Sequence, residues 1–511
     1  MKPQSLLRNI LLCAAMVGVP LAQAADPVRI QVDAKAGDTP FPHFWEQMFG
    51  SGRAVLALRD NYRQDLGAVK QATDFGYVRF HGIFNDDVGL FSIDRDGKPV
   101  YNFSYVDQIY DGLLERGVKP FVELSFMPKD MTSDPKALQE FWYHPNVAPP
   151  KDYKLWNGMI DAFARHLIER YGIDEVASWY FEVWNEPNGF WAGKPNQATY
   201  FTLYDNTARA LKAVSPRLRV GGPATAQGAM VKDFLEHTHS GNVPVDFLST
   251  HVYGDDTAKN VFKTDEDIPR SDMVCRTVDM VHKQIQASPY PSIPFIMSEF
   301  NASYANLPNV TDTVYMGPWM ANTIRQCAGK VDIMSYWAFS DVFEEQGVVK
   351  TPFYGGFGLI AADRIPKPAF NAFAILHKLG DRRIALDSDS AIVTKRKDGT
   401  IVIAVWNYAP PVGDGPTYTP GAPKGDTRHF DFEIASLPVG VKADVWRVDP
   451  THGNVVATFD IMGRPAFPSR EQLAKLRDAA KLPAPERMVV VPGGKFGVDI
   501  PPQGLAVIEL H

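Results

Sequence analysis

The chain has 511 residues, of which 45% are hydrophobic and 22% charged, with 39 Gly, 40 Pro and a formal net charge of -7 at pH 7. This is the composition of an ordinary globular protein, so it excludes a disordered chain, a collagen-like repeat and a disulfide-rich scaffold. The length predicts one large core and at least one smaller domain. The acidic balance argues against a nucleic-acid partner, because there is no excess of Lys and Arg to neutralise phosphates.

Residues 1–24 have the pattern of a secretory signal peptide. Lys2 and Arg8 precede an apolar run over residues 10–22, and Ala22-Gln23-Ala24 offers small residues for cleavage. The run is shorter than the ~20 apolar residues that cross a bilayer, so a membrane anchor is the less favoured alternative. We expect a periplasmic or secreted protein that makes no membrane contact once the peptide is removed.

Three cysteines are too few to define a disulfide framework. Removal of the signal peptide takes away Cys13 and leaves Cys275 and Cys327, which both fall in segments with a helical pattern. An oxidising compartment permits these two residues to pair but does not require it. The sequence therefore does not predict a bridge.

Between residues 40 and 380, short apolar runs rich in β-branched and aromatic residues alternate with longer segments of helical period. The expected strands lie at 44–50, 77–83, 120–126, 179–184, 219–223, 246–252, 294–300 and 333–339, and the clearest helices at 105–117, 153–172, 200–214 and 368–379. Eight strands followed by helices predict an α/β fold of the (β/α)8, or TIM, barrel class. A doubly wound open sheet is the alternative, but no G-x-G-x-x-G follows the first strand.

The remaining residues, 381–511, change to an apolar period of two from about Ala391. Strands are expected at 391–395, 401–406, 442–448, 455–460, 488–491 and 504–510, with one helix at 471–481. We interpret this region as a small antiparallel β-sandwich. The N-terminal segment 25–39 contains a further strand, 28–33, that is expected to join it.

Two of the expected barrel strands end in a glutamate. Glu186 follows the fourth strand in Trp184-Asn-Glu-Pro-Asn188, and Glu299 ends the seventh in Ser298-Glu-Phe-Asn301. The C-terminal ends of barrel strands surround one site. Two carboxylates there suit cleavage of a glycosidic bond, in which one protonates the leaving oxygen and the other attacks the anomeric carbon. A single strand-end Glu is as often a salt bridge or a cap, so the pair is what carries the hypothesis.

These two stretches resemble the clan of retaining glycosidases built on the (β/α)8 barrel. Further stretches resemble glycoside hydrolase family 39, the family of β-xylosidases and α-L-iduronidases. They are G-S-G at 50–52, R-F-H-G-I-F at 79–84, T-H-V-Y-G at 250–254, Y-W-A-F-S-D-V-F-E-E at 336–345 and P-F-Y-G-G-F-G-L at 352–359. The resemblance covers the whole predicted barrel and, more loosely, the sandwich.

The resemblance implies that Glu186 is the general acid/base and Glu299 the nucleophile. Asn185 is expected to hydrogen-bond the sugar 2-hydroxyl, a contact that strengthens in an oxocarbenium-like transition state. The other implied roles are binding of sugar hydroxyls by His81 and His251, orientation of the nucleophile by Tyr253, and support of the nucleophile from behind by Arg79.

The segment after the eighth strand supplies the last candidates. Trp337 is expected to give the sugar ring an apolar platform, although a Trp at a strand end is more often part of a core. The resemblance implies that Glu344 and Glu345 accept hydrogen bonds from sugar hydroxyls, whereas a charge pair in a loop is more often only solvated. Metal ligation by the histidines is disfavoured because no close His, Asp or Glu spacing accompanies them, so we expect no metal or other cofactor.

Together these expectations describe a retaining exo-glycosidase that releases β-D-xylose from the non-reducing ends of xylo-oligosaccharides by double displacement. Alternatives within the family are an α-L-iduronidase and an endo-acting exopolysaccharide hydrolase. A uronate substrate needs basic residues, whereas the motifs contain only Arg79 and an acidic pair at Glu344 and Glu345. A non-catalytic carbohydrate-binding barrel is a further alternative, and the presence of both carboxylates argues against it. The sequence leaves the oligomeric state open.

Overall fold

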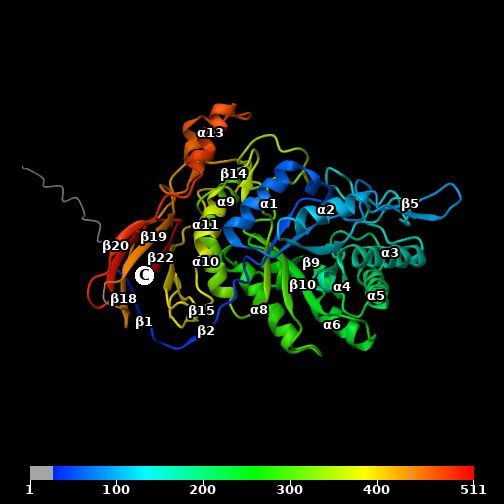
Figure 1. The fold of residues 1–511 in the computed structure, drawn as a ribbon, viewed down its shortest axis with the longest axis horizontal. Coiled ribbons are helices and arrows are strands. Elements are labelled where there is room, and N and C mark those ends of the chain that lie inside the picture. Colours follow the sequence, from blue (N-terminus) through cyan, green and yellow to red (C-terminus); the bar gives the residue numbers. More distant parts are fainter. Residues whose placement is uncertain (1–26, 439) are drawn as a thin grey trace, which may run out of the picture.

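The computed structural model describes residues 27–438 and 440–511, and the predicted signal peptide lies outside them. Figure 1 shows a central barrel, coloured from blue through green to yellow, beside a layer of orange and red strands that the N-terminal strand joins. None of the helices in the described part of the chain combines the length and the hydropathy needed to span a bilayer.

Eight parallel strands close into the barrel. They are β3 (Met48–Ser51), β4 (Tyr77–Phe80), β7 (Lys119–Leu124), β8 (Tyr180–Val183), β9 (Arg219–Thr225), β10 (Phe247–Tyr253), β11 (Phe295–Asn301) and β12 (Ile333–Tyr336). The last strand pairs with the first, with Ser335 opposite Met48. The predicted TIM barrel is therefore confirmed.

Helices, 3-10 turns and short hairpins connect the strands. The α-helices are α1 (Asp60–Thr73), α2 (Ser104–Leu114), α3 (Tyr153–Tyr171), α4 (Ile173–Val176), α5 (Asn196–Val214), α6 (Val231–Ser240), α7 (Ala258–Val261), α8 (Met273–Gln286), α9 (Pro308–Thr311), α10 (Met316–Cys327) and α11 (Pro368–Leu376). Two 3-10 turns, η1 (Ala54–Leu58) and η2 (Ala226–Gly228), and the hairpins β5 (Phe91–Ile93)–β6 (Pro99–Tyr101) and β13 (Ile360–Ala361)–β14 (Ile365–Pro366) complete the barrel domain. In α3, the side chain of Asp152 accepts a hydrogen bond from the first turn, and Gly172 ends the helix at φ 82°.

Side chains that point into the barrel form layers, because successive strand residues alternate between the two faces. The layer at the N-terminal ends is apolar and contains Met48, Phe121, Phe247, Ile296 and Ile333, with Tyr77 and Tyr180 packed against it. Two positions further along β4, β7 and β8 lie Arg79, Glu123 and Glu182, all with 0% exposure. An apolar floor thus supports a buried charged layer, which lies toward the strand ends where the site is expected.

A seven-stranded and a three-stranded sheet make the accessory domain, which confirms the predicted antiparallel sandwich. The larger sheet has the order β2 (Asp38–Pro40), β15 (Arg382–Ile384), β16 (Ala391–Lys395), β17 (Ile401–Asn407), β22 (Gly504–Leu510), β19 (Lys442–Val448) and β20 (Glu486–Val489). The smaller has β1 (Val28–Asp33), β18 (Arg428–Ala435) and β21 (Lys495–Ile500). Ile30, Ile403, Phe430 and Val445 belong to the core that the two sheets share. The N-terminal strand enters this domain by pairing in parallel with β18.

The prediction of a strand at 455–460 is wrong, because this segment is the helix α12 (Val455–Ile461). Its buried residues Val455, Val456 and Phe459 form one helical face, which packs in a small cluster with Leu476 of α13 (Arg470–Ala479). The β-branched run favoured a strand, but tertiary packing decided for a helix. Among the strands of this domain that were not predicted, β18 and β21 do alternate between buried apolar and outward charged residues, which is the pattern of a half-buried strand.

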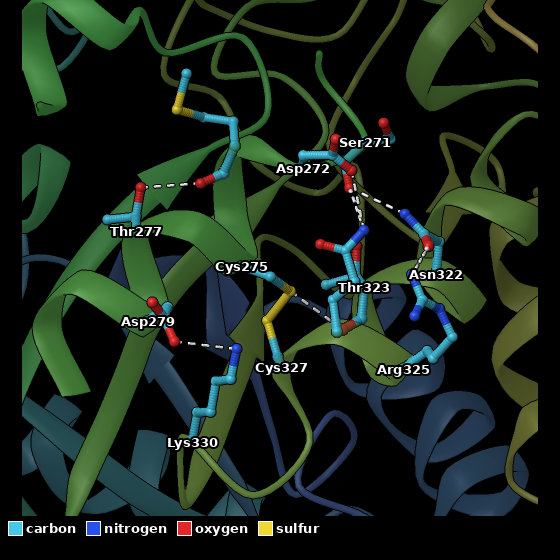
Figure 2. Close-up of a disulfide and its surroundings, with 12 residues drawn as sticks. Ser271, Asp272, Cys275, Thr277, Asp279, Asn322, Thr323, Arg325, Cys327 and Lys330 are labelled. Carbon is cyan, nitrogen blue, oxygen red and sulfur yellow. Dashed lines mark hydrogen bonds and ion pairs between the residues drawn. A yellow bond between two sulfur atoms is a disulfide. The ribbon is translucent and has the colours of Figure 1, made fainter. Parts of the chain in front are cut away.

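Cys275 of α8 and Cys327 of α10 form a disulfide that links two helices 52 residues apart in sequence. Figure 2 shows the bridge between these helices, with the ion pair of Asp279 and Lys330 nearby, at 3.1 Å. The sequence left this pairing open, since only the closure of the barrel brings α8 and α10 side by side.

Candidate active site

A cavity of about 320 Å³ lies at the C-terminal ends of the barrel strands. Its lining includes seven predicted site residues: His81, Asn185, Glu186, Tyr253, Glu299, Trp337 and Glu345. A larger hollow of about 1010 Å³ lies outside the barrel beside α8, but charged side chains in its lining, such as Asp279 and Lys283, pair with one another. The smaller cavity is the candidate active site, because acids, an imidazole and aromatic rings converge on it.

Glu299, on β11, accepts hydrogen bonds on both carboxylate oxygens. Nη1 of Arg79 lies 2.6 Å from Oε1, and the hydroxyl of Tyr253 donates to Oε2 across 2.6 Å. Both donors are buried. The two bonds hold the carboxylate in one orientation, and Arg79 places a positive charge beside it.

Arg79 is the centre of the charged layer. Nε lies 2.6 Å from Glu182, Nη2 lies 2.8 Å from Glu123, and Nη2 also donates to Oδ1 of Asn185 across 2.9 Å. Burial alone lowers the pKa of Arg79, but the carboxylates of Glu182, Glu123 and Glu299 reverse this and raise it above the ordinary value. Arg79 therefore remains a cation, and it connects the nucleophile candidate with the residue before Glu186.

His81 brings a second positive charge to the cavity. Its Nδ1 lies 2.7 Å from Oε2 of Glu123, and its Nε2 lies 3.6 Å from Oε1 of Glu345 and 3.9 Å from Oε1 of Glu299. Burial lowers the pKa of His81, but the adjacent Glu123 carboxylate outweighs it and raises the pKa to about 9. At neutral pH His81 is thus an imidazolium whose second N–H faces the carboxyls of the cavity.

The hydrogen bonds around His251 assign its tautomer. Ser298 has one hydroxyl proton, which it donates to Oε1 of Glu182 across 2.6 Å. The serine oxygen therefore accepts from Nε2–H of His251, 3.1 Å away. Nδ1 then carries a lone pair, and it faces Oε1 of Glu186 at 2.9 Å. Because burial lowers the pKa of His251 to about 4, the imidazole is neutral and Glu186 has to be the donor.

The structure places His251 beside Glu186 and not in the cavity wall, where the resemblance implied that it binds a sugar hydroxyl. Its side chain is fully buried and is not part of the cavity lining. It acts on Glu186 instead. The contacts of His251 depend on Ser298, which lies on the neighbouring strand, so neither a strand-end position nor a sequence motif specifies them.

Glu186 lines the cavity and keeps its proton to a higher pH than an ordinary glutamate. Burial raises its pKa to about 7, and the positive charges of His81 and Arg79 oppose this only in part. Its backbone has φ 44°, a left-handed conformation that non-glycine residues adopt at an energetic cost and that is common at active sites. One oxygen of Glu186 and one of Glu299 lie within 4.8 Å of each other.

The sequence model described as Glycosyl hydrolases family 39 matches residues 28–493. The chain belongs to glycoside hydrolase family 39. It is 40% identical over 455 residues to a β-xylosidase of Geobacillus stearothermophilus, covering 87% of each chain. The crystal structure of a monomeric β-xylosidase from Caulobacter crescentus CB15 has a TM-score of 0.87 and 35% identity, covering 95% of this chain and 99% of that one. An α-L-iduronidase of Mus musculus is 26% identical over 262 residues, which cover 47% of this chain and 39% of that protein.

This family 39 hydrolase places Trp337 in the cavity wall by means of a glycine. A Cβ atom on Gly50 would lie 2.0 Å from Cε3 of Trp337, so no larger residue fits below the indole. Phe343 also packs edge-to-face against Trp337, with ring centroids 5.6 Å apart. The contacts with Gly50 and Phe343 fix the position of the indole, which is only 3% exposed although it lines the cavity.

The two adjacent glutamates of the hydrolase point to different places. Glu345 lines the cavity, and burial raises its pKa to about 8. Glu344 does not line it and instead accepts two hydrogen bonds from Arg59, with Arg53 also 3.5 Å away. The structure therefore does not bring Glu344 to the cavity, and the expected contact of Glu344 with a sugar hydroxyl stays a prediction. Its backbone has φ 64°, and its ion pairs with both arginines hold it away from the site.

Three residues that support the site were not predicted: Glu123, Glu182 and Ser298. Glu123 and Glu182 stand in the middle of apolar strands, where a charged residue is buried only if it is paired. A charged residue inside an apolar strand could therefore have been identified from the sequence. Ser298 had no such signal, because a Ser in a strand is compatible with many environments.

Glu186, His251 and Glu299 lie close enough together to ligate a metal ion. The donors already in place argue against it, since Arg79 and Tyr253 use both oxygens of Glu299. Arg79 and the protonated His81 also repel a divalent cation there. The residues present therefore fit acid–base and nucleophilic chemistry better than metal binding.

Proposed function

We propose that this hydrolase is an exo-acting β-D-xylosidase that retains the anomeric configuration, with Glu299 as the nucleophile and Glu186 as the general acid/base. The observation that carries retention is the approach of the two carboxyls to within 4.8 Å between oxygens. Retaining glycosidases hold these groups ~5–5.5 Å apart, whereas inverting enzymes leave ~6.5–9.5 Å for a water molecule.

The reaction has two steps. In the first, Glu299 attacks the anomeric carbon while Glu186 gives its proton to the departing glycosidic oxygen, which leaves a covalent glycosyl-enzyme. In the second, the Glu186 carboxylate takes a proton from a water that attacks the same carbon, and the bond to Glu299 breaks. Two inversions at one carbon give net retention.

The neighbouring groups have distinct parts in these steps. Arg79 and Tyr253 orient Glu299 for attack, and their hydrogen bonds weaken as its charge is lost to the new bond. Asn185 uses its Oδ1 to accept from Arg79, so its amide N–H groups are left for the sugar 2-hydroxyl. A contact at that hydroxyl strengthens as positive charge develops on the ring.

The charge of the cavity favours a neutral sugar. The described residues of its lining include no Lys or Arg, and the one imidazolium, His81, is already paired with Glu123. A uronate would meet Glu345 and Glu299 instead of a cation. The resemblance to the β-xylosidase of Geobacillus stearothermophilus over most of the chain supports xylose as the sugar.

Hydrolysis of xylotetraose, followed by NMR, tests the proposal. We expect xylose as the first small product, as its β-anomer before mutarotation. The α-anomer first would indicate inversion, and xylobiose first would indicate endo action. A panel of nitrophenyl glycosides (β-xyloside, α-arabinoside, β-glucoside and α-L-iduronide) compares sugars, and preferential cleavage of the iduronide would contradict the assignment.

The Glu299→Ala variant tests the nucleophile directly. Turnover should disappear, and azide should restore cleavage of an activated xyloside with α-xylosyl azide as the product. Unchanged activity of this variant would exclude Glu299 as the nucleophile.

The protein is also proposed to act in the periplasm or outside the cell. The predicted signal peptide supports this, and the Cys275–Cys327 disulfide suits an oxidising compartment. Fractionation of the native host, with mass spectrometry of the N-terminus, should find a mature chain that begins near Ala25. An intact Met1 in the cytoplasmic fraction would contradict it.

A further inference from the structure

A second cluster of potential metal ligands lies at the opposite end of the barrel from the cavity. His43 and Glu46 precede the first barrel strand β3, and His377 follows helix α11 at the end of the barrel domain. Oε1 of Glu46 lies 2.5 Å from Nδ1 of His43 and 2.8 Å from Nδ1 of His377. Neither the reaction nor the sequence motifs use any of these residues.

The proton positions around His43 call for a cation in this cluster. Its Nε2 lies 3.0 Å from the carbonyl oxygen of Leu379, which can only accept, so Nε2 carries a proton. In a neutral ring, Nδ1 then holds a lone pair that faces a carboxylate oxygen of Glu46. Two lone pairs at this distance repel, unless a proton or a metal ion lies between them. A ring N–H donated to a backbone carbonyl is also how metal-bound histidines are commonly oriented.

Glu46 supplies a second, independent observation. Its side chain is only 4% exposed, and its Oε2 is buried without a hydrogen-bond partner. A buried carboxylate oxygen without a partner among the described residues is energetically unfavourable. Because the imidazoles face Oε1, a cation removes that penalty when Glu46 binds it through both of its carboxylate oxygens. The two rings are more open, with side-chain exposures of 22% for His43 and 40% for His377. That exposure leaves a route for an ion and space for a water ligand.

We propose that His43, Glu46 and His377 bind one divalent transition-metal ion, with zinc as the best match. Two imidazoles and one carboxylate, completed by water, are an established ligand set for zinc. Zinc bonds of ~2.0–2.1 Å place donor atoms roughly 3.3 Å apart, so the partly exposed rings need to shift outward by less than about 1 Å. The ion joins the start of the first barrel strand to the end of the last barrel helix. Its role is therefore structural and lies outside the reaction.

Zinc binding to protein dialysed against EDTA is the test. We expect one tightly held zinc per chain by calorimetry and elemental analysis. We also expect a rise of a few degrees in the apparent melting temperature, because an ion that binds only the folded chain stabilises it. In crystals soaked with zinc, the anomalous signal should lie between the three side chains. Absence of both the bound ion and the thermal shift would overturn the proposal and leave a proton as the cation between His43 and Glu46.

Variants separate this cluster from other sites. His377→Asn should lose the ion and the thermal shift while xyloside hydrolysis is retained, and Glu46→Gln should also lose the ion. His429→Asn is the matched control, since His429 also faces two carboxylates, Asp431 and Asp499, at the surface of the sandwich. It should bind zinc like the wild type.

The catalytic carboxylates need a separate control. Glu299→Gln disrupts the other group of potential ligands, and zinc should still bind this variant with unchanged stoichiometry. Loss of zinc from Glu299→Gln, or full binding by His377→Asn, would show that the ion occupies another place and would overturn the assignment.

Discussion

Nδ1 of His251 lies 2.9 Å from Oε1 of Glu186, with the side of the imidazole that has no proton turned toward the carboxyl. The neutral ring can accept a hydrogen bond there but cannot donate one. This contact favours the protonated form of Glu186, which is the form that a general acid needs. A residue that does not touch the cavity thereby controls the proton of one that does.

The pH dependence of activity should follow the proton on Glu186. Its pKa is raised to about 7, so the acid form is lost as pH rises through that value. We expect kcat/KM for xylobiose to fall above about pH 7, because its poor leaving group requires the proton.

The Glu186→Ala variant gives the control for this profile. Hydrolysis of xylobiose should fall by roughly 10²–10⁴-fold. Formation of the glycosyl-enzyme from 2,4-dinitrophenyl β-xyloside should survive, since this leaving group departs without a proton. If kcat/KM of the variant for the activated substrate still falls at high pH, that fall does not report the ionisation of Glu186.

Replacing His251 should move the fall of kcat/KM at high pH to lower pH values. His251→Phe removes the acceptor that favours protonated Glu186, so the pKa of Glu186 falls and the acid form is lost earlier. Ser298→Ala should move this fall in the same direction by less, because it only removes the hydrogen-bond acceptor that fixes the tautomer of His251. Profiles of kcat/KM for xylobiose measure both variants, and a shift to higher pH would contradict the proton assignment.

Gly50→Ala should disable the cavity through Trp337. The new methyl would lie 2.0 Å from Cε3 of Trp337, so the indole has to move. A misplacement of about 1 Å in a binding wall costs roughly 10²-fold in rate, and we expect a loss of that order in kcat/KM. Gly67→Ala is the matched control, because nothing lies within 4 Å of its Cβ position in α1. Equal activity of the two variants would contradict the packing argument.

Lys367→Met should destabilise the barrel domain by about 3–5 kcal/mol, because removing one partner of a buried ion pair leaves an uncompensated charge. Lys367 is fully buried and lies 2.7 Å from both Asp312 and Asp341. These carboxylates accept from the backbone N–H groups of Gly355 and Gly358, so they hold the glycine loop that carries Phe357 to the cavity.

Guanidinium unfolding measures this loss. Lys397→Met provides the comparison, since its side chain is 91% exposed and the change should be near neutral. Adding Asp312→Asn and Asp341→Asn to Lys367→Met should restore part of the stability. Failure of these additions to restore any stability would show that the lost packing of the lysine stem, and not its charge, is responsible.

The fold class was predictable because apolar periodicity reports secondary structure directly. Runs such as 294–300 carry a glutamate next to their C-terminal end, so Glu299 was identifiable before any tertiary information. The helix α12 shows the limit of this approach. A β-branched run has no fixed secondary structure until its neighbours are known, and the packing of Phe459 near Leu476 decided it.

The sequence alone identified Glu186 and Glu299, their order along the chain and the TIM barrel that holds them. Each glutamate lies in a short motif at the end of a predicted strand, and such a motif can be recognised without tertiary information. Tertiary structure decided which of Glu344 and Glu345 faces the cavity, where the proton on Glu186 lies, and that Cys275 meets Cys327. Each of these depends on groups that are distant in sequence. The site groups become buried, and the electrostatic field around them forms, only when folding brings Arg79, Glu182 and His251 together from separate strands.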